Sequence, residues 1–304
     1  MTGISAGKAW SRIGAEVAPT SSAASGVWQI GEVAENVGAG TWPAWDAIKL
    51  SGGTETESGG YKYYTFNSTG TLTVTNDGVV DILMIAGGGG GGGQFSYNGS
   101  AGGGAGGYRT FDNITIYDGT YTLTVGAGGA AGGNEARGSK GSDTTFNQAT
   151  GSGWTNLSCT GGGGGGVAMN PSAQTGGSAS GTAYYQGNWH SSGASGNEGG
   201  YTPAEGNDSQ SSSAWNTAGG GGAGSDGGNG MSSETWGGDG STWHDGVTRG
   251  GGGSYNSTDH GYLGGGGGSG RDDGVANTGG GAAARRGPNT ADGGSGVVIV
   301  RVAA

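Results

Sequence analysis

Residues 81–93 read DILMIAGGGGGGG, a short apolar run followed at once by seven consecutive glycines. The run 81–86 has the length and composition of a buried β-strand. Glycine loses more conformational freedom on folding than any other residue, so seven in a row are either disordered or held in a structure that only glycine permits. The choice between these two states decides the fold of the chain.

The composition favours an ordered structure. Glycine makes up 82 of the 304 residues, but there are only 5 prolines and no sustained Gly-X-Y repeat, which excludes a collagen triple helix. The chain also has 9 tryptophans, 12 tyrosines and a hydrophobic share of 31%, which is more than flexible Gly/Ser linkers carry. We therefore expect the glycine runs to belong to a folded domain.

Charge and cysteine content exclude several classes of protein. The net charge is −11 with only 12 Lys and Arg residues, so we expect no nucleic-acid partner, because phosphate binding needs clustered basic side chains. Cys159 is the only cysteine, and no disulfide can form within the chain. No apolar stretch approaches 18 residues and no apolar leader begins the chain. We therefore expect that the protein is made in the cytoplasm and does not insert into a membrane.

The chain divides into four segments by composition. Residues 1–50 hold four tryptophans and few glycine pairs, and we expect a small N-terminal attachment module there, with Trp10, Trp28, Trp42 and Trp45 as its contact residues. The segments that follow are a β-strand segment at 51–86, a glycine-rich bundle at 87–296 and a closing β-strand at 297–304. Short runs rich in aromatic and apolar residues, bounded by turn signals, predict strands at 61–66, 71–74, 79–85, 121–125 and 297–302.

Polyproline II geometry, called polyglycine II where the residues are glycine, accounts best for the glycine runs. This extended left-handed helix has three residues per turn and no internal hydrogen bonds, so its N–H and C=O groups point outward. Inside a domain those groups must bond to neighbouring segments, and only glycine allows approach from every side. The predicted fold class is mostly irregular and all-β: a polyglycine II helix bundle bracketed by short β-strands, with little or no α-helix.

The connections between glycine runs differ in length and content, and the long ones carry aromatic residues. Function on a rigid scaffold usually lies in its loops, and Tyr and Trp supply large contact areas at low entropic cost. Six aromatic residues stand several positions from the nearest long glycine run, so we expect them to project beyond the bundle and to bind a receptor. These candidates are Tyr184, Tyr185, Trp189, Trp215, Trp236 and Trp243.

Five motifs in order, VDILMIAGGGGGGG, AGGGAGGYRT, YTLTVGAGG, LSCTGGGGGG and GGSGVVIVRV, resemble the glycine-rich domain proteins of tailed bacteriophages over residues 61–304. Related adhesins at tail-fibre tips are sandwiches of polyglycine II helices whose distal loops choose the host surface. The resemblance implies a virion tail-fibre or tail-tip protein, made in the host cytoplasm, that binds a host cell-surface glycan or outer-membrane protein. We also expect residues 1–50 to dock on another virion structural protein, because their four tryptophans outnumber what so small a segment can bury alone.

Other functions are weighed against this interpretation. A capsid-attached fibre or a purely structural protein would share the scaffold. An ice-binding protein would need a planar face of small residues, and the bulky aromatic residues in the loops argue against such a face. A homotrimer is favoured by analogy with fibres and because strands at 61–86 and 297–302 would otherwise leave open sheet edges. His190, His244 and His260 are expected to be exposed loop residues, so we expect no enzyme activity, no cofactor and no metal site.

Overall fold

A computed structural model describes residues 47–93, 99–167, 172–183, 193–211, 217–228, 236–254, 266, 272–284 and 291–304. The chain divides into two compact units, Met1–Ala47 and Ile48–Ala304, and only the second is described here. The tryptophans of the predicted attachment module therefore lie outside the described residues. Within the described ranges the chain forms twelve β-strands and no α-helix, in agreement with the predicted class. No helix long and apolar enough to cross a membrane occurs in them.

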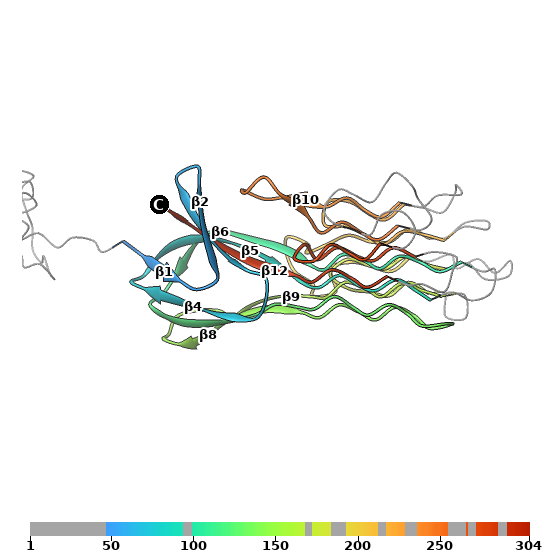
Figure 1. Cartoon of the computed structure of the whole chain (residues 1–304), viewed down its shortest axis with the longest axis horizontal. Helices are drawn as coiled ribbons and strands as arrows, with labels where there is room; N and C mark the ends of the chain where they lie inside the picture. Colours follow the sequence, from blue (N-terminus) through green and yellow to red (C-terminus); the bar gives the residue numbers. More distant parts are fainter. Residues whose placement is uncertain are drawn as a thin grey trace, which may run out of the picture. The chain divides into compact units, whose positions relative to one another are not determined.

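Two five-stranded antiparallel sheets form one part of the unit (Figure 1). Sheet 1 has the order β2-β3-β12-β5-β6. Its strands are β2 (Thr54–Ser58), β3 (Tyr61–Phe66), β12 (Val297–Ala303), β5 (Gly78–Ile85) and β6 (Tyr108–Ile116). Sheet 2 has the order β1-β4-β7-β8-β9. Its strands are β1 (Lys49–Ser51), β4 (Gly70–Thr75), β7 (Gly119–Thr124), β8 (Thr144–Thr150) and β9 (Leu157–Cys159).

The main hydrophobic core lies between the two sheets. β4 and β7 alternate, with Leu72, Val74, Tyr121 and Leu123 buried and the threonines between them exposed, as expected for strands with one solvated face. β5 is buried on both faces. Its residues Ile82 and Met84 join the core, while Leu83 and Ile85 belong to a second cluster on the outer face of sheet 1.

A short hairpin supplies the rest of that second cluster. Its strands are β10 (Ser241–Thr242) and β11 (Thr248–Arg249), which pair with each other and with no other strand in the described part of the chain. We call residues 241–249 the hairpin. Trp243, between the two strands, packs in the outer cluster with Tyr63, Leu83 and Ile85.

The glycine-rich segments form a bundle of extended rods next to the sheets, as predicted, and several rods continue a strand directly (Figure 1). β5 runs into rod 87–93, and rod 101–107 runs into β6. We call this bundle the lattice. Its described rods include 87–93, 101–107, 128–133, 136–142, 161–166, 176–183, 217–222, 236–240, 250–254, 279–284 and 291–296.

Rod 87–93 shows the hydrogen-bond period of a polyglycine II helix. Each of its seven N–H groups donates to a neighbouring rod at N···O distances of 2.9–3.0 Å, and every third residue donates to the same neighbour. The acceptors are Ser142, Ser139 and Ala136 for Gly87, Gly90 and Gly93; Gly294 and Ala291 for Gly88 and Gly91; and Gly104 and Ala101 for Gly89 and Gly92. Three neighbours are thus antiparallel to the rod, because their residue numbers fall as its own rise.

The carbonyl groups of the same rod bind three further neighbours, which run parallel to it. The donors are Gly129 and Gly132, Gly162 and Gly165, and Ala282. Rod 87–93 therefore has six neighbours and is the centre of the lattice. A Cβ placed on any of its seven glycines would lie 1.7–2.3 Å from a carbonyl oxygen of a neighbouring rod. Only glycine fits there, which answers why seven follow one another.

The structure changes two details of the predicted organisation. β6 to β11 lie inside the range 87–296 that was assigned to the bundle, because the chain returns to the sheets between rods. β3, β5 and β12, whose edges were expected to need covering by other copies, each pair on both sides. The sheet edges are β2 and β6 in sheet 1 and β1 and β9 in sheet 2. The edge argument for a homotrimer was therefore wrong, although the oligomeric state itself stays a prediction.

Candidate functional site

Several rods end or begin on the side of the lattice away from the sheets, which we call the remote end. Gly93 lies there, eight residues past Ile85, and Ser100 forms a bridge with Val167 at the same end. Gly91 donates to Ala291 (2.9 Å), which places the start of rod 291–296 at this end as well. Described residues on both sides of several loop segments thus meet at one end of the lattice.

Of the six predicted receptor-binding residues, four lie outside the described residues: Tyr184, Tyr185, Trp189 and Trp215. Trp236 begins rod 236–240 at the remote end, and 47% of its surface is exposed. Its main chain is held in the lattice, because Gly228 N–H donates to the Trp236 carbonyl at 2.9 Å. The lattice therefore fixes the backbone of Trp236 while its indole remains accessible to solvent.

The prediction that Trp243 projects beyond the lattice was wrong. Trp243 is only 6% exposed and lies on the outer face of sheet 1, with its ring edge-on to Tyr63 at a centroid distance of 6.3 Å. Rod 236–240 carries the chain from the remote end back to the sheets before the hairpin begins. The number of residues from a glycine run does not reveal at which end of the lattice a loop lies.

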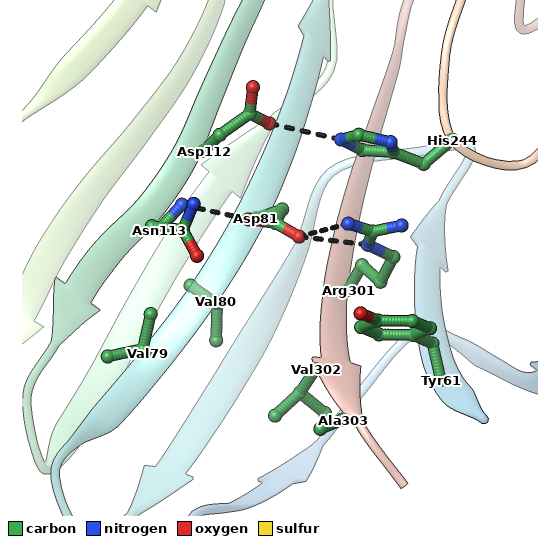
Figure 2. Close-up of a pocket in the computed structure, with 10 residues that line it drawn as sticks. All are labelled: Tyr61, Val79, Val80, Asp81, Asp112, Asn113, His244, Arg301, Val302 and Ala303. Atoms are coloured by element: carbon green, nitrogen blue, oxygen red, sulfur yellow. Dashed lines mark hydrogen bonds and ion pairs between the residues drawn. The ribbon is translucent and has the colours of Figure 1, made fainter.

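A second candidate site is a polar pocket of about 470 Å³ on the outer face of sheet 1 (Figure 2). At its centre Asp81 on β5 is only 9% exposed. Arg301 on β12 donates to Asp81 Oδ2 from Nε at 2.9 Å and from Nη2 at 2.5 Å, while Asn113 N–H donates to Oδ1 at 2.8 Å. Asp81 is therefore held in one orientation by neighbours on both sides of its strand.

Electrostatics keep this pair ionised. Burial opposes the charged form of Asp81, but the hydrogen bond from Asn113 and the ion pair with Arg301 outweigh it, so the pKa of Asp81 is lowered. Burial likewise opposes the charged form of Arg301, and its contacts with Asp81 raise the pKa of Arg301. The Tyr61 ring lies against the guanidinium, 4.2 Å from its carbon to the ring centroid.

The hairpin completes the pocket. His244 Nε2 lies 3.2 Å from Asp112 Oδ1, and both side chains are partly exposed. His244 is exposed, as the sequence predicted, but the contact with Asp112 was not predicted. No sequence signal connects it with Asp112, because 132 residues separate them and the contact arises only when the hairpin folds onto sheet 1. The pocket thus brings one imidazole and two carboxylates to the same place.

Comparison with known proteins supports the glycine-rich part of the sequence interpretation. A family model described as a glycine-rich domain matches residues 64–303, a range that begins within β3 and ends with β12 and so includes the lattice and every strand of the two sheets after β3. No curated protein matches the chain. Since the family model covers most of its length, the chain belongs to this glycine-rich domain family.

Proposed function

We propose that this member of the glycine-rich domain family is a tail-fibre or tail-tip protein of a bacteriophage virion. In this proposal, aromatic loops at the remote end of the lattice recognise a glycan or an outer-membrane protein on the host bacterium. The observation that carries the proposal is the convergence of the loop-flanking residues at one end of the lattice, with Trp236 half-exposed among them.

The lattice suits this role because it fixes the starting points of the loops. Every N–H group of rod 87–93 is bonded to a neighbouring rod, so its remote end has little freedom to move. Binding residues on a rigid scaffold lose less entropy when a complex forms. Loops of any length can then vary while the rods that hold them stay unchanged.

The charge of the chain narrows the receptor chemistry. With a net charge of −11, the protein repels polyanionic surfaces, which favours a neutral glycan or a protein loop as the receptor. Indole rings that face solvent provide flat apolar surfaces for sugar rings or side chains. We further propose that residues 1–50 attach the chain to another virion protein, and that three copies assemble. Light scattering tests the assembly against the monomer mass of 29.1 kDa.

Adsorption to host cells tests the receptor-binding role. We expect Trp236→Ala to weaken binding of the purified protein to host cells by more than tenfold, since truncating an aromatic anchor at a contact costs ~2 kcal/mol or more. The double variant Trp189→Ala with Trp215→Ala is expected to weaken it at least as much. Both variants must first show an unchanged melting temperature.

Val247→Ala is the matched control. Val247 is also apolar and exposed, at 45%, but it lies in the hairpin near the sheets. We expect this variant to bind cells as the unaltered protein does. If the Trp236 variant and the double variant are both stable and both bind fully, the remote end is not the receptor-binding surface and the proposal fails.

A further inference from the structure

We propose that Asp81, Asp112 and His244 form a binding site for a divalent transition-metal cation such as Zn²⁺ in the pocket on sheet 1. One ligand atom from each side chain can be chosen so that all three lie within 4.8 Å of one another. They come from three separate elements, β5, β6 and the hairpin (Figure 2). This inference is independent of the proposed receptor-binding function.

The spacing of the His244 and Asp112 ligand atoms suits a shared cation. Zn²⁺ binds imidazole nitrogen and carboxylate oxygen at about 2.0–2.2 Å, so two ligands of one ion lie roughly 3.0–3.5 Å apart. His244 Nε2 and Asp112 Oδ1 are 3.2 Å apart. One nitrogen and two oxygens form a donor set that Zn²⁺ and neighbouring transition metals accept, whereas Ca²⁺ and Mg²⁺ prefer oxygen alone.

Asp81 is held ready as a ligand. A carboxylate offers about four lone-pair positions, and here Oδ2 accepts two hydrogen bonds from Arg301 while Oδ1 accepts only one, from Asn113. Oδ1 therefore keeps a free position. Carboxylates that bind metals are usually fixed in this way by hydrogen bonds from neighbouring groups.

Charge and space set the character of the site. Beside the His244 imidazole, two carboxylates and one guanidinium carry a net charge of −1, which attracts a cation but less strongly than the two carboxylates would alone. The pocket of about 470 Å³ leaves room for water molecules as the remaining ligands. Because His244 belongs to the hairpin and both aspartates to sheet 1, the ion would fasten the hairpin to the sheet.

Calorimetric titration of the full chain with ZnCl₂ tests the site. We expect saturable binding with one strong site, and a rise in melting temperature with increasing Zn²⁺, since a ligand that binds only the folded state stabilises it. His244→Ala should weaken this binding by at least tenfold. Asp112→Asn should do the same without disturbing the fold, because the Asp112 side chain is half-exposed.

The other two histidines provide the control. The double variant His190→Ala with His260→Ala should bind Zn²⁺ as the unaltered protein does. The proposal is overturned if the full chain shows neither heat of binding nor thermal stabilisation at millimolar Zn²⁺. It is also overturned if binding survives in His244→Ala and Asp112→Asn but disappears in the double variant.

Discussion

Replacing Gly90 with alanine is expected to disrupt the centre of the lattice. A Cβ at Gly90 would lie 2.1 Å from the carbonyl oxygen of Ala130, whereas ordinary contact begins at 3.4 Å. Rod 128–133 must therefore move away by about 1.3 Å. The added Cβ is fixed to the backbone of rod 87–93 and meets a backbone carbonyl oxygen of the neighbouring rod, so no side-chain rotation can relieve the clash.

The cost follows from the hydrogen bonds that this movement breaks. Gly129 N–H and Gly132 N–H donate to rod 87–93 at 2.8 and 2.9 Å, and a shift of this size stretches both to about 4 Å, beyond hydrogen-bonding distance. The two lost bonds cost ~1 kcal/mol each and the two buried N–H groups left without a partner ~1–3 kcal/mol each, so the total is on the order of 4–8 kcal/mol. Reduced freedom of the unfolded chain returns only ~0.4–1 kcal/mol.

Urea unfolding followed by circular dichroism measures this loss. A fall on the order of 4–8 kcal/mol would remove most of the stability of a typical domain, so Gly90→Ala should be largely unfolded or insoluble. Gly133→Ala is the control, because a Cβ there meets nothing within 4 Å. It should fold normally. If Gly90→Ala unfolds within ~0.5 kcal/mol of the unaltered protein, the packing argument for the glycine run is wrong.

Two further predictions concern a buried hydroxyl and the unit boundary. Burial raises the pKa of Tyr108 to about 12, so the folded state holds this proton more tightly and its contribution to stability falls as pH rises from about 10 to about 12. The hydroxyl is buried without a hydrogen-bond partner among the described residues, so Tyr108→Phe should be at least as stable as the unaltered protein at pH 7. In urea unfolding above pH 10, the variant should lose less stability than the unaltered protein. A loss of ~1 kcal/mol or more in the variant at pH 7 would contradict this expectation. A chain of residues 48–304, which keeps Ile48 and β1, should fold and bind cells yet fail to join virions, and normal incorporation would refute the attachment role of residues 1–50.

Local sequence patterns predicted those elements that can be recognised without knowing which segments lie next to them. The alternation in 71–74 identified β4, because apolar residues at every second position mark a face that will be buried, and the aromatic-rich and apolar runs at 61–66 and 79–85 identified β3 and β5. The glycine run at 87–93 likewise indicated polyglycine II packing. In contrast, β8 has the sequence TTFNQAT, whose single large apolar residue, Phe146, gives no such alternation. It is a strand because it pairs with β7 and β9.

The candidate sites were less predictable, because they depend on which ends of the chain segments meet. Trp236 and Trp243 are seven residues apart and looked equivalent in sequence, yet Trp236 lies at the remote end of the lattice and Trp243 lies in the hairpin, packed on sheet 1. Asp81 looked like part of a buried strand, and only the structure pairs it with Arg301, 220 residues later. Contacts of such long range leave no local pattern in a single sequence.

One local pattern did carry more information than the long runs alone. Rod 136–142 reads ARGSKGS, and its glycines at 138 and 141 face the central rod, where a Cβ would lie 2.0 Å from a carbonyl oxygen of rod 87–93. Between them Ser139 is exposed and Lys140 reaches Glu198 at 2.6 Å. A helix with three residues per turn needs glycine at every third position when one side is crowded.

The glycine pattern of a rod therefore reports how many of its sides are occupied. Rod 136–142 contacts other rods on part of its circumference and has glycine at positions 138 and 141 with larger residues between them. Rod 87–93, in contrast, has six neighbours and consists of glycine alone. Rod 101–107 also has six neighbours, and it carries only glycine and the fully buried Ala101 and Ala105. Both central rods thus exclude every side chain larger than a methyl group. That exclusion follows from the spacing of the backbones and not from any particular partner. In a sequence, a long run of glycine therefore indicates a rod at the centre of such a lattice, and glycine at every third position indicates a rod at its surface.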